Sequence, residues 1–169
     1  MIKNGHQYQV TKSWVEKFQQ AIINLYQNEE KKEKDPTGWK LIIDSYFSQI
    51  KNLLDEISEY DYLASHNSEK PLILSNNNIS FSELGEVLVK VRIAKQITQK
   101  ELAILVDLSE EKIQEYEQKD YQNARFDTVI EVAEALGIKL QHCVFVAETS
   151  NFVNEELVKI RQAISKIKG

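Results

Sequence analysis

Residues 99–117 read QKELAILVDLSEEKIQEYE. The stretch holds two short helical patterns whose apolar faces are made of Leu102, Val106, Leu108, Ile113 and Tyr116. Ala103 is small at the point where two such helices must cross closely. Asp107 lies at the turn, where Asp tolerates a positive φ better than most side chains, and Ser109 offers an N-cap hydroxyl to the second pattern. The stretch therefore predicts two helices that cross at a steep angle around a tight turn.

The whole chain has the composition of an ordinary globular protein. Its 169 residues are 42% apolar and 28% charged, with a single cysteine, Cys143. We therefore expect no disorder, no internal disulfide and no cysteine-based zinc site. No run of about 18 apolar residues occurs, and the first residues lack a leader pattern, so we expect a cytoplasmic protein without a membrane segment.

Two amphipathic helices are expected in residues 1–64. The first begins near Thr11, a good capping residue, and ends at about Asn28. Residues 29–38 are charged and end in turn formers, which predicts an exposed connection. The second helix carries a heptad seam of apolar residues: Trp39, Ile43, Tyr46, Ile50, Leu53, Ile57 and Tyr60. Two interpretations stay open, because this seam suits either a helical hairpin within the chain or a coiled coil between two chains.

A linker and a second helical domain are expected next. Residues 65–79 are rich in Asn and Ser, which predicts the linker. Residues 80–137 then hold four helical patterns, with Ser80 as the first cap and Gly137 as the residue that ends the last helix.

The C-terminal segment, residues 138–169, combines two patterns. Residues 138–147 are β-branched and aromatic, which predicts a short β-strand. From about Asn151 the pattern becomes that of an amphipathic helix with apolar residues at heptad spacing: Val153, Leu157, Ile160, Ile164 and Ile167. The expected fold is thus mainly α, with one short strand.

Residues 80–137 resemble the helix-turn-helix domain of the Cro/cI-type (XRE) repressor family. The apolar positions, the cap, the turn and the pair Tyr116–Glu117 all fall in register with that family. The opening residues and the helix that ends near Tyr60 resemble a subset of XRE regulators with an N-terminal helical hairpin. The resemblance implies a homodimeric transcription regulator that binds double-stranded DNA, such as a repressor, or an antitoxin that represses its own operon and holds a toxin.

The resemblance also implies the residues of a DNA interface. In this fold the second helix of the motif enters the major groove, and the helix before it crosses the backbone. Phosphate contacts are implied for Lys95, Gln99, Lys100, Asn123 and Arg125. The positions that face the bases are Glu110, Glu111, Lys112, Gln114 and Glu115. Arg92 and Glu117 are implied to form a structural ion pair.

The excess of acidic residues in the helix-turn-helix segment argues against a function limited to DNA binding. The chain has a net charge of −5, and residues 80–140 carry 8 basic and 12 acidic side chains, a balance of −4 (8 − 12). A glutamate can accept a hydrogen bond from cytosine N4, but Glu110, Glu111 and Glu115 together weaken the attraction to phosphate. Acids in a first turn also favour the helix dipole, and Glu115 is placed to pair with Lys119. The alternative function is a protein–protein interaction module that keeps the helix-turn-helix scaffold with weakened or lost DNA binding.

Patterns for catalysis are absent from the sequence. His142 and Cys143 are adjacent, and neighbours on a strand point to opposite faces, so they do not predict a shared site. There is no glycine-rich phosphate loop. We therefore expect no enzymatic activity, no cofactor and no bound metal.

Overall fold

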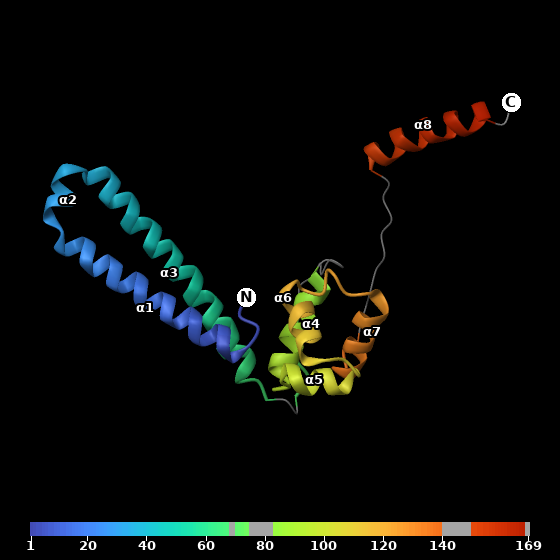
Figure 1. Ribbon diagram of the computed structural model, residues 1–169, viewed down its shortest axis with the longest axis horizontal. Helices are drawn as coiled ribbons and strands as arrows, with labels where there is room; N and C mark the ends of the chain where they lie inside the picture. The colour runs from blue at the N-terminus through green and yellow to red at the C-terminus, as the bar shows by residue number, and fades with distance from the viewer. Residues whose placement is uncertain (68–69, 75–82, 140–149, 168–169) are drawn as a thin grey trace. The chain divides into compact units, whose positions relative to one another are not determined.

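The structure, a computed structural model, describes residues 1–67, 70–74, 83–139 and 150–167. Contacts divide the chain into two compact units, Met1–Lys139 and Leu140–Gly169. The helices of the first unit are α1 (Gly5–Gln27), α2 (Glu29–Lys34), α3 (Pro36–Ala64), α4 (Leu84–Ala94), α5 (Gln99–Leu105), α6 (Glu110–Gln118) and α7 (Phe126–Ala135), and the second unit holds α8 (Asn151–Ile167) (Figure 1). The described residues are mainly helical, so the prediction of a mainly α fold is confirmed for them.

The first helix begins earlier than its apolar pattern predicts. Asn4 is the N-cap of α1, and its side chain accepts a hydrogen bond from the backbone N–H of Gln7 at 2.9 Å. Thr11 therefore lies inside the helix, and the predicted start at Thr11 was wrong. The cap, rather than the first apolar residue, sets the boundary because it satisfies a backbone donor that the helix leaves unpaired.

The charged connection between the two long helices is also helical. The structure has α2 in residues 29–34, and residues 29–37 are exposed, so the predicted exposed connection is present and part of it is a short helix. Asn28 caps the helix, acids occupy its first turn and lysines its last. These charges complement the helix dipole, which favours one short helix in a segment without apolar residues.

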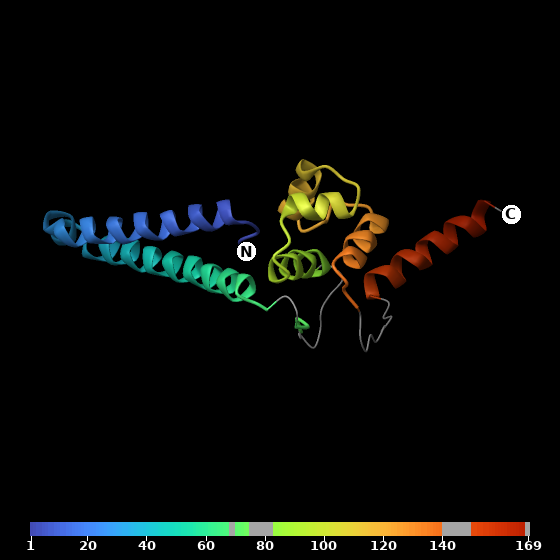
Figure 2. The same ribbon diagram turned by 90° about the horizontal axis from the view of Figure 1, so that it is seen from below.

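The long helices α1 and α3 pack side by side as an antiparallel hairpin (Figures 1 and 2). Val15 and Ile22 of α1 are buried against Ile50 of α3, and the seam residues Tyr46, Leu53 and Ile57 pack against this cluster. The heptad seam is thus used within the chain, as the hairpin interpretation predicts.

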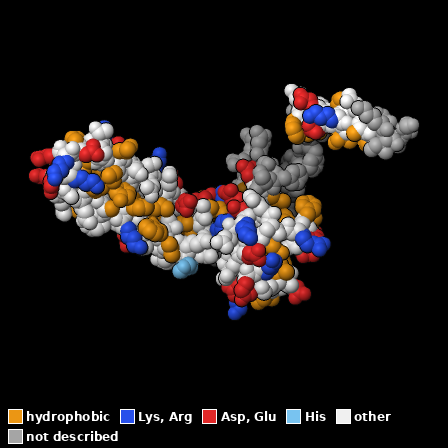
Figure 3. Space-filling model, turned by 45° about the horizontal axis from the view of Figure 1, so that its top comes forward, with side chains coloured by type: hydrophobic (Ala, Val, Ile, Leu, Met, Phe, Trp, Pro, Cys, Tyr) orange, Lys and Arg blue, Asp and Glu red, His pale blue; other side chains and the backbone are white. Residues whose placement is uncertain are grey.

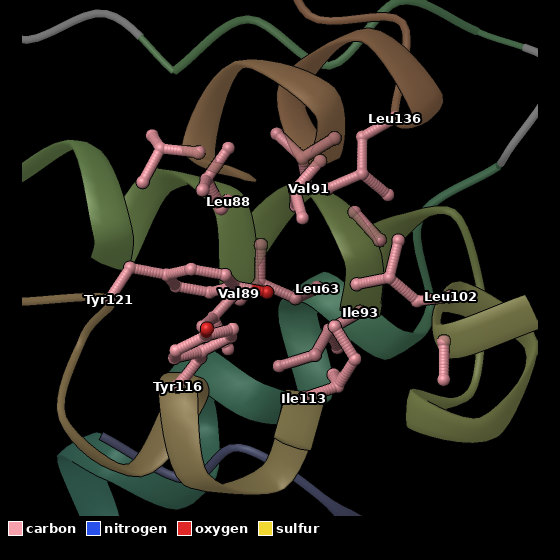
Figure 4. Close-up of a cluster of buried hydrophobic side chains, with 14 residues drawn as sticks. Leu63, Leu88, Val89, Val91, Ile93, Leu102, Ile113, Tyr116, Tyr121 and Leu136 are labelled. Atoms are coloured by element: carbon pink, nitrogen blue, oxygen red, sulfur yellow. The ribbon is translucent and has the colours of Figure 1, made fainter. Parts of the chain in front are cut away.

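Helices α4 to α7 enclose the main core together with the end of α3 (Figure 4). Leu63 of α3 is 2% exposed and packs in this core, so the hairpin is anchored to the helices that follow it. A close approach of backbone to backbone occurs at Gly85 of α4, where a Cβ would lie 1.8 Å from the carbonyl oxygen of Asp120. Only glycine permits that approach.

The turn between α5 and α6 has the geometry that its residues predict. Asp107 has φ 52°, and the Ser109 side chain accepts a hydrogen bond from the backbone N–H of Lys112 at 3.2 Å. At the start of α5, Thr98 and Glu101 form a capping box. Gly137 follows α7 with φ 64°, the conformation expected for a residue that ends a helix.

Two expectations for the flanking segments fall on residues that are not described. Ser80 belongs to residues 75–82, and most of the predicted strand belongs to residues 140–149; both ranges lie outside the described residues.

The amphipathic C-terminal helix is present as α8. Among the described residues, none of the helices has the length and hydropathy that a membrane span requires.

Candidate nucleic-acid interface

Helix α6 presents one face to the core and the other to solvent. Ile113, Tyr116 and Glu117 are buried, which fixes the helix on α4 and α5. The positions predicted to face DNA bases lie on the remaining surface: Glu111 and Gln114 are exposed, and Glu110, Lys112 and Glu115 are half-buried. The core contacts therefore leave the predicted reading positions accessible.

Glu115 is the centre of a local network on this face. Its carboxylate accepts hydrogen bonds from Lys112 Nζ and from Asn123 Nδ2, each at 2.8 Å. Lys119 Nζ lies 3.6 Å from the same carboxylate. The hydrogen bond from Lys112, helped by the positive charges of Lys112 and Lys119, holds the pKa of Glu115 below its ordinary value. The negative charge of Glu115 is thus partly balanced by Lys112 on α6 and by Lys119, the residue that follows the helix.

The other two glutamates are also held locally. Glu110 accepts a hydrogen bond from Gln114 Nε2 at 3.2 Å. The pKa of Glu111 is lowered by a hydrogen bond from its own backbone N–H and then by one from the Ser109 hydroxyl. Both glutamates lie in the first turn of α6, where the helix dipole favours an acid.

Three of the five predicted phosphate ligands donate to acidic side chains of the same chain. Asn123 binds Glu115 as described above, and Arg125 binds Asp127 with an N–O distance of 2.6 Å. Gln99 Nε2 donates to Glu117 Oε2 at 2.8 Å. The remaining two, Lys95 and Lys100, are exposed and make no ion pair with any described residue. The free cationic groups of the predicted rim are therefore these two lysines.

Arg92 and Glu117 form a buried bidentate ion pair between α4 and α6. The side chains are 5% and 1% exposed, and Arg92 NH2 lies 2.7 Å from Glu117 Oε2. Arg92 also donates to the carbonyl oxygens of Ile97 and Lys3, at 2.9 and 2.7 Å. Gln99 also donates to Oε2 of Glu117. The buried carboxylate of Glu117 and the buried guanidinium of Arg92 therefore both have hydrogen-bond partners as well as an opposite charge.

The N-terminal segment binds the C-terminal end of α6. Lys3 Nζ donates to the carbonyl oxygens of Glu117 and Gln118 and lies 2.6 Å from Asp120 Oδ1. Ile2 is buried, and Asn4 donates to Gln99 Oε1 at 3.4 Å. A positive charge at the last carbonyls of a helix complements its dipole. Nothing in the sequence pointed to Lys3, because its partners lie more than 110 residues away.

A shallow polar groove runs between the first turn of α1 and α6. Its lining consists of Lys3, Asn4, His6 and Gln7 from the N-terminal side and of Gln99, Gln114, Glu117 and Gln118 from the helix-turn-helix. Most of these side chains offer both donors and acceptors. The groove therefore extends the polar surface of α6 towards α1.

Comparison with known protein families identifies this region. Residues 88–142 match the family model HTH_3, described as helix-turn-helix. The chain contains an XRE-type helix-turn-helix domain. That family consists of DNA-binding regulators rather than enzymes. No curated protein and no solved structure matches the chain.

The match covers the XRE domain from within α4 through α7 and leaves the N-terminal hairpin outside. The resemblance of the hairpin to a subset of XRE regulators therefore stays a prediction. Within the domain, α5 and α6 are the two helices of the motif, and α6 is the helix that enters the major groove in this fold.

Proposed function

We propose that the protein is a dimeric transcriptional regulator that binds double-stranded DNA and places α6 in the major groove. The observation that carries this proposal is the match of residues 88–142 to the helix-turn-helix family, together with the exposed outer face of α6. Two such helices in a symmetric dimer would contact half-sites about one DNA turn, or about 34–36 Å, apart. Repression of its own operon as an antitoxin is one form of this function.

The proposal requires a way for an acidic helix to approach DNA. Lys112 and Lys119 already balance Glu115, so the carboxylate does not meet the phosphates as an isolated charge. Arg125 is 83% exposed and can exchange Asp127 for a phosphate without unfolding any element. A glutamate on this face can accept a hydrogen bond from cytosine N4, so we expect a preference for cytosine at the base pair that Glu115 meets.

A protein–protein interaction module is the second candidate. It is favoured by the engagement of Gln99, Asn123 and Arg125 with carboxylates of the same chain, which leaves fewer donors for phosphate. In that case α6 would present its acidic face to a basic protein partner, such as a toxin.

Fluorescence anisotropy with a duplex from the region upstream of the protein's own gene separates the two candidates. We expect binding below micromolar at low salt, weaker binding to a scrambled duplex, and a negative slope of log affinity against log salt concentration. Lys95→Met and Lys100→Met should each reduce the steepness of that slope by about one unit if each lysine meets a phosphate.

Charge reversal on α6 gives the second arm of the experiment. Glu115→Arg should tighten binding to any duplex, because it removes a carboxylate and releases Lys112 and Lys119 for phosphates. Glu16→Arg makes the same charge change on the exposed surface of α1 and is the matched control. Equal affinity of the wild type for the upstream and scrambled duplexes at every salt concentration would contradict the proposal. Binding by Glu115→Arg alone would favour the protein-interaction module.

A further inference from the structure

Helix α8 carries an apolar stripe that the described residues of its own unit do not cover. Val153, Ile160 and Ile164 are 44%, 51% and 49% exposed. The spacing of these residues places them on one side of the 17-residue helix, and Figure 3 shows charged side chains beside apolar ones on α8. An amphipathic helix of this kind gains its stability by burying the stripe against another surface.

The spacing of the stripe is that of a coiled coil. Leu157 and Ile164 take the a positions of a heptad, and Val153, Ile160 and Ile167 take the d positions. In this register Glu156 is a g residue and Arg161 is an e residue. Five residues turn the helix by about 140° beyond a full turn, so these two charges lie on opposite flanks of the stripe.

The charges on the two flanks distinguish among arrangements of two copies. In a parallel, in-register pair each g residue faces the e residue five positions further along the other helix. Glu156 then faces Arg161 of the second copy, and the symmetric contact repeats on the other side. In an antiparallel pair, g residues face g residues and e residues face e residues. The flank with Glu156 then lies beside the same flank of the second copy, and so does the flank with Arg161, so charges of the same sign come together.

We propose that α8 binds α8 of a second copy of this chain as a parallel coiled coil, with Glu156 paired to Arg161 across both sides. Within one chain Glu156 already binds Lys159 at 2.7 Å, and its side chain is still 41% exposed, so it can meet the second copy's arginine from the other side. Leu157 at a with Ile160 at d favours three or four strands over two, and neighbouring helices of such a parallel bundle keep the same contact.

This inference rests on the proposed function for its biological role, because the α8 contact would supply the second subunit that a dimeric DNA-binding protein needs. The association itself is measured without DNA, by sedimentation velocity of the full chain from 1 to 100 μM. We expect concentration-dependent association into dimers, trimers or tetramers. Ile160→Glu puts a charge in the central d layer and should abolish the association over this range.

A charge swap tests the pairing of the flanks. Glu156→Lys and Arg161→Glu each create two like-charge contacts in the parallel pair and should raise the dissociation constant about tenfold. The double variant Glu156→Lys with Arg161→Glu restores opposite charges and should return the dissociation constant to within threefold of the wild type. Glu155→Lys changes an outward f position and is the matched control, with no expected effect.

Helix orientation is read by cross-linking. In a Cys143→Ser background, Val153→Cys places a thiol in the first d layer of each helix. The parallel arrangement brings these thiols together, so mild oxidation should yield a disulfide-linked dimer. The antiparallel arrangement separates them by the length of the helix.

The proposal is overturned if the chain is a monomer at 100 μM, or if Ile160→Glu leaves the association unchanged. The second result would place the contact on another surface and leave DNA binding by a dimer intact. Loss of sequence-specific DNA binding by a chain that still associates through α8 would contradict the proposed function alone.

Discussion

Replacement of Glu117 by glutamine tests how α6 is held. Glu117 is 1% exposed, and its two oxygens accept hydrogen bonds from Arg92 Nε and NH2 and from Gln99 Nε2. Glutamine offers a single acceptor oxygen and turns an NH2 group towards these donors. The guanidinium of Arg92 then stays buried without a counter-charge.

Loss of one partner of a buried pair costs about 3–5 kcal/mol. For a chain of this size we therefore expect the melting temperature of Glu117→Gln to fall by about 6–20 °C. Urea denaturation followed by circular dichroism measures the free energy of unfolding. Glu134→Gln, an exposed site on α7, is the control and should change it by less than about 0.5 kcal/mol.

Arg92→Met should destabilise the fold by a similar amount, because it leaves the buried carboxylate of Glu117 unpaired. The free energy of unfolding of the double variant Arg92→Met with Glu117→Gln should fall by less than the sum of the two single decreases, because neither side chain is then left as an unpaired buried charge. A loss below about 1 kcal/mol for Glu117→Gln would refute the view that this pair fixes α6 on α4.

Three further variants probe local geometry. Asp107→Gly should stabilise the fold by about 0.5–1 kcal/mol, because Asp107 has φ 52° and glycine adopts that conformation without strain; thermal melting measures it, and a lower melting temperature would contradict the reasoning. Gly85→Ala should destabilise the fold by more than about 2 kcal/mol, since its Cβ would lie 1.8 Å from the Asp120 carbonyl oxygen; an unchanged urea midpoint would show that the backbone adjusts freely. Lys112→Met should raise the pKa of Glu115 in an NMR titration, because the hydrogen bond from Lys112 is the largest cause of its lowered pKa. A lowered pKa in the fold means that the contribution of Glu115 to stability is present above its ordinary pKa and is lost as the pH falls through the lowered value; an unchanged pKa in the variant would remove Lys112 as the cause.

The sequence predicted the elements whose signals are local. Asp107 and Ser109 marked the turn before α6 because a positive φ and a cap are properties of single residues. The heptad seam around Ile50 predicted that this helix packs against another helix. The sequence left open whether that helix belongs to the same chain, and the structure shows that it is α1. The start of α1 was misplaced because Asn4 lies well before the first apolar residue of the pattern.

The sequence predicted which residues lie at the candidate interface, but it did not predict their hydrogen-bond partners. The family register placed Gln99, Asn123 and Arg125 at the rim, yet their hydrogen bonds to Glu117, Glu115 and Asp127 depend on side-chain directions that a sequence does not encode. The contact of Lys3 with the end of α6 was not predictable either, since it joins the first residues of the chain to a helix far along the sequence.

Selection of binding sites from a random duplex library tests most directly whether α6 reads DNA. We predict that the wild type enriches a motif of two half-sites about 10 base pairs apart, with a cytosine in each half-site that Glu115→Gln no longer selects. A wild type that enriches no motif, although it is folded and associated, would contradict a DNA-reading role for α6.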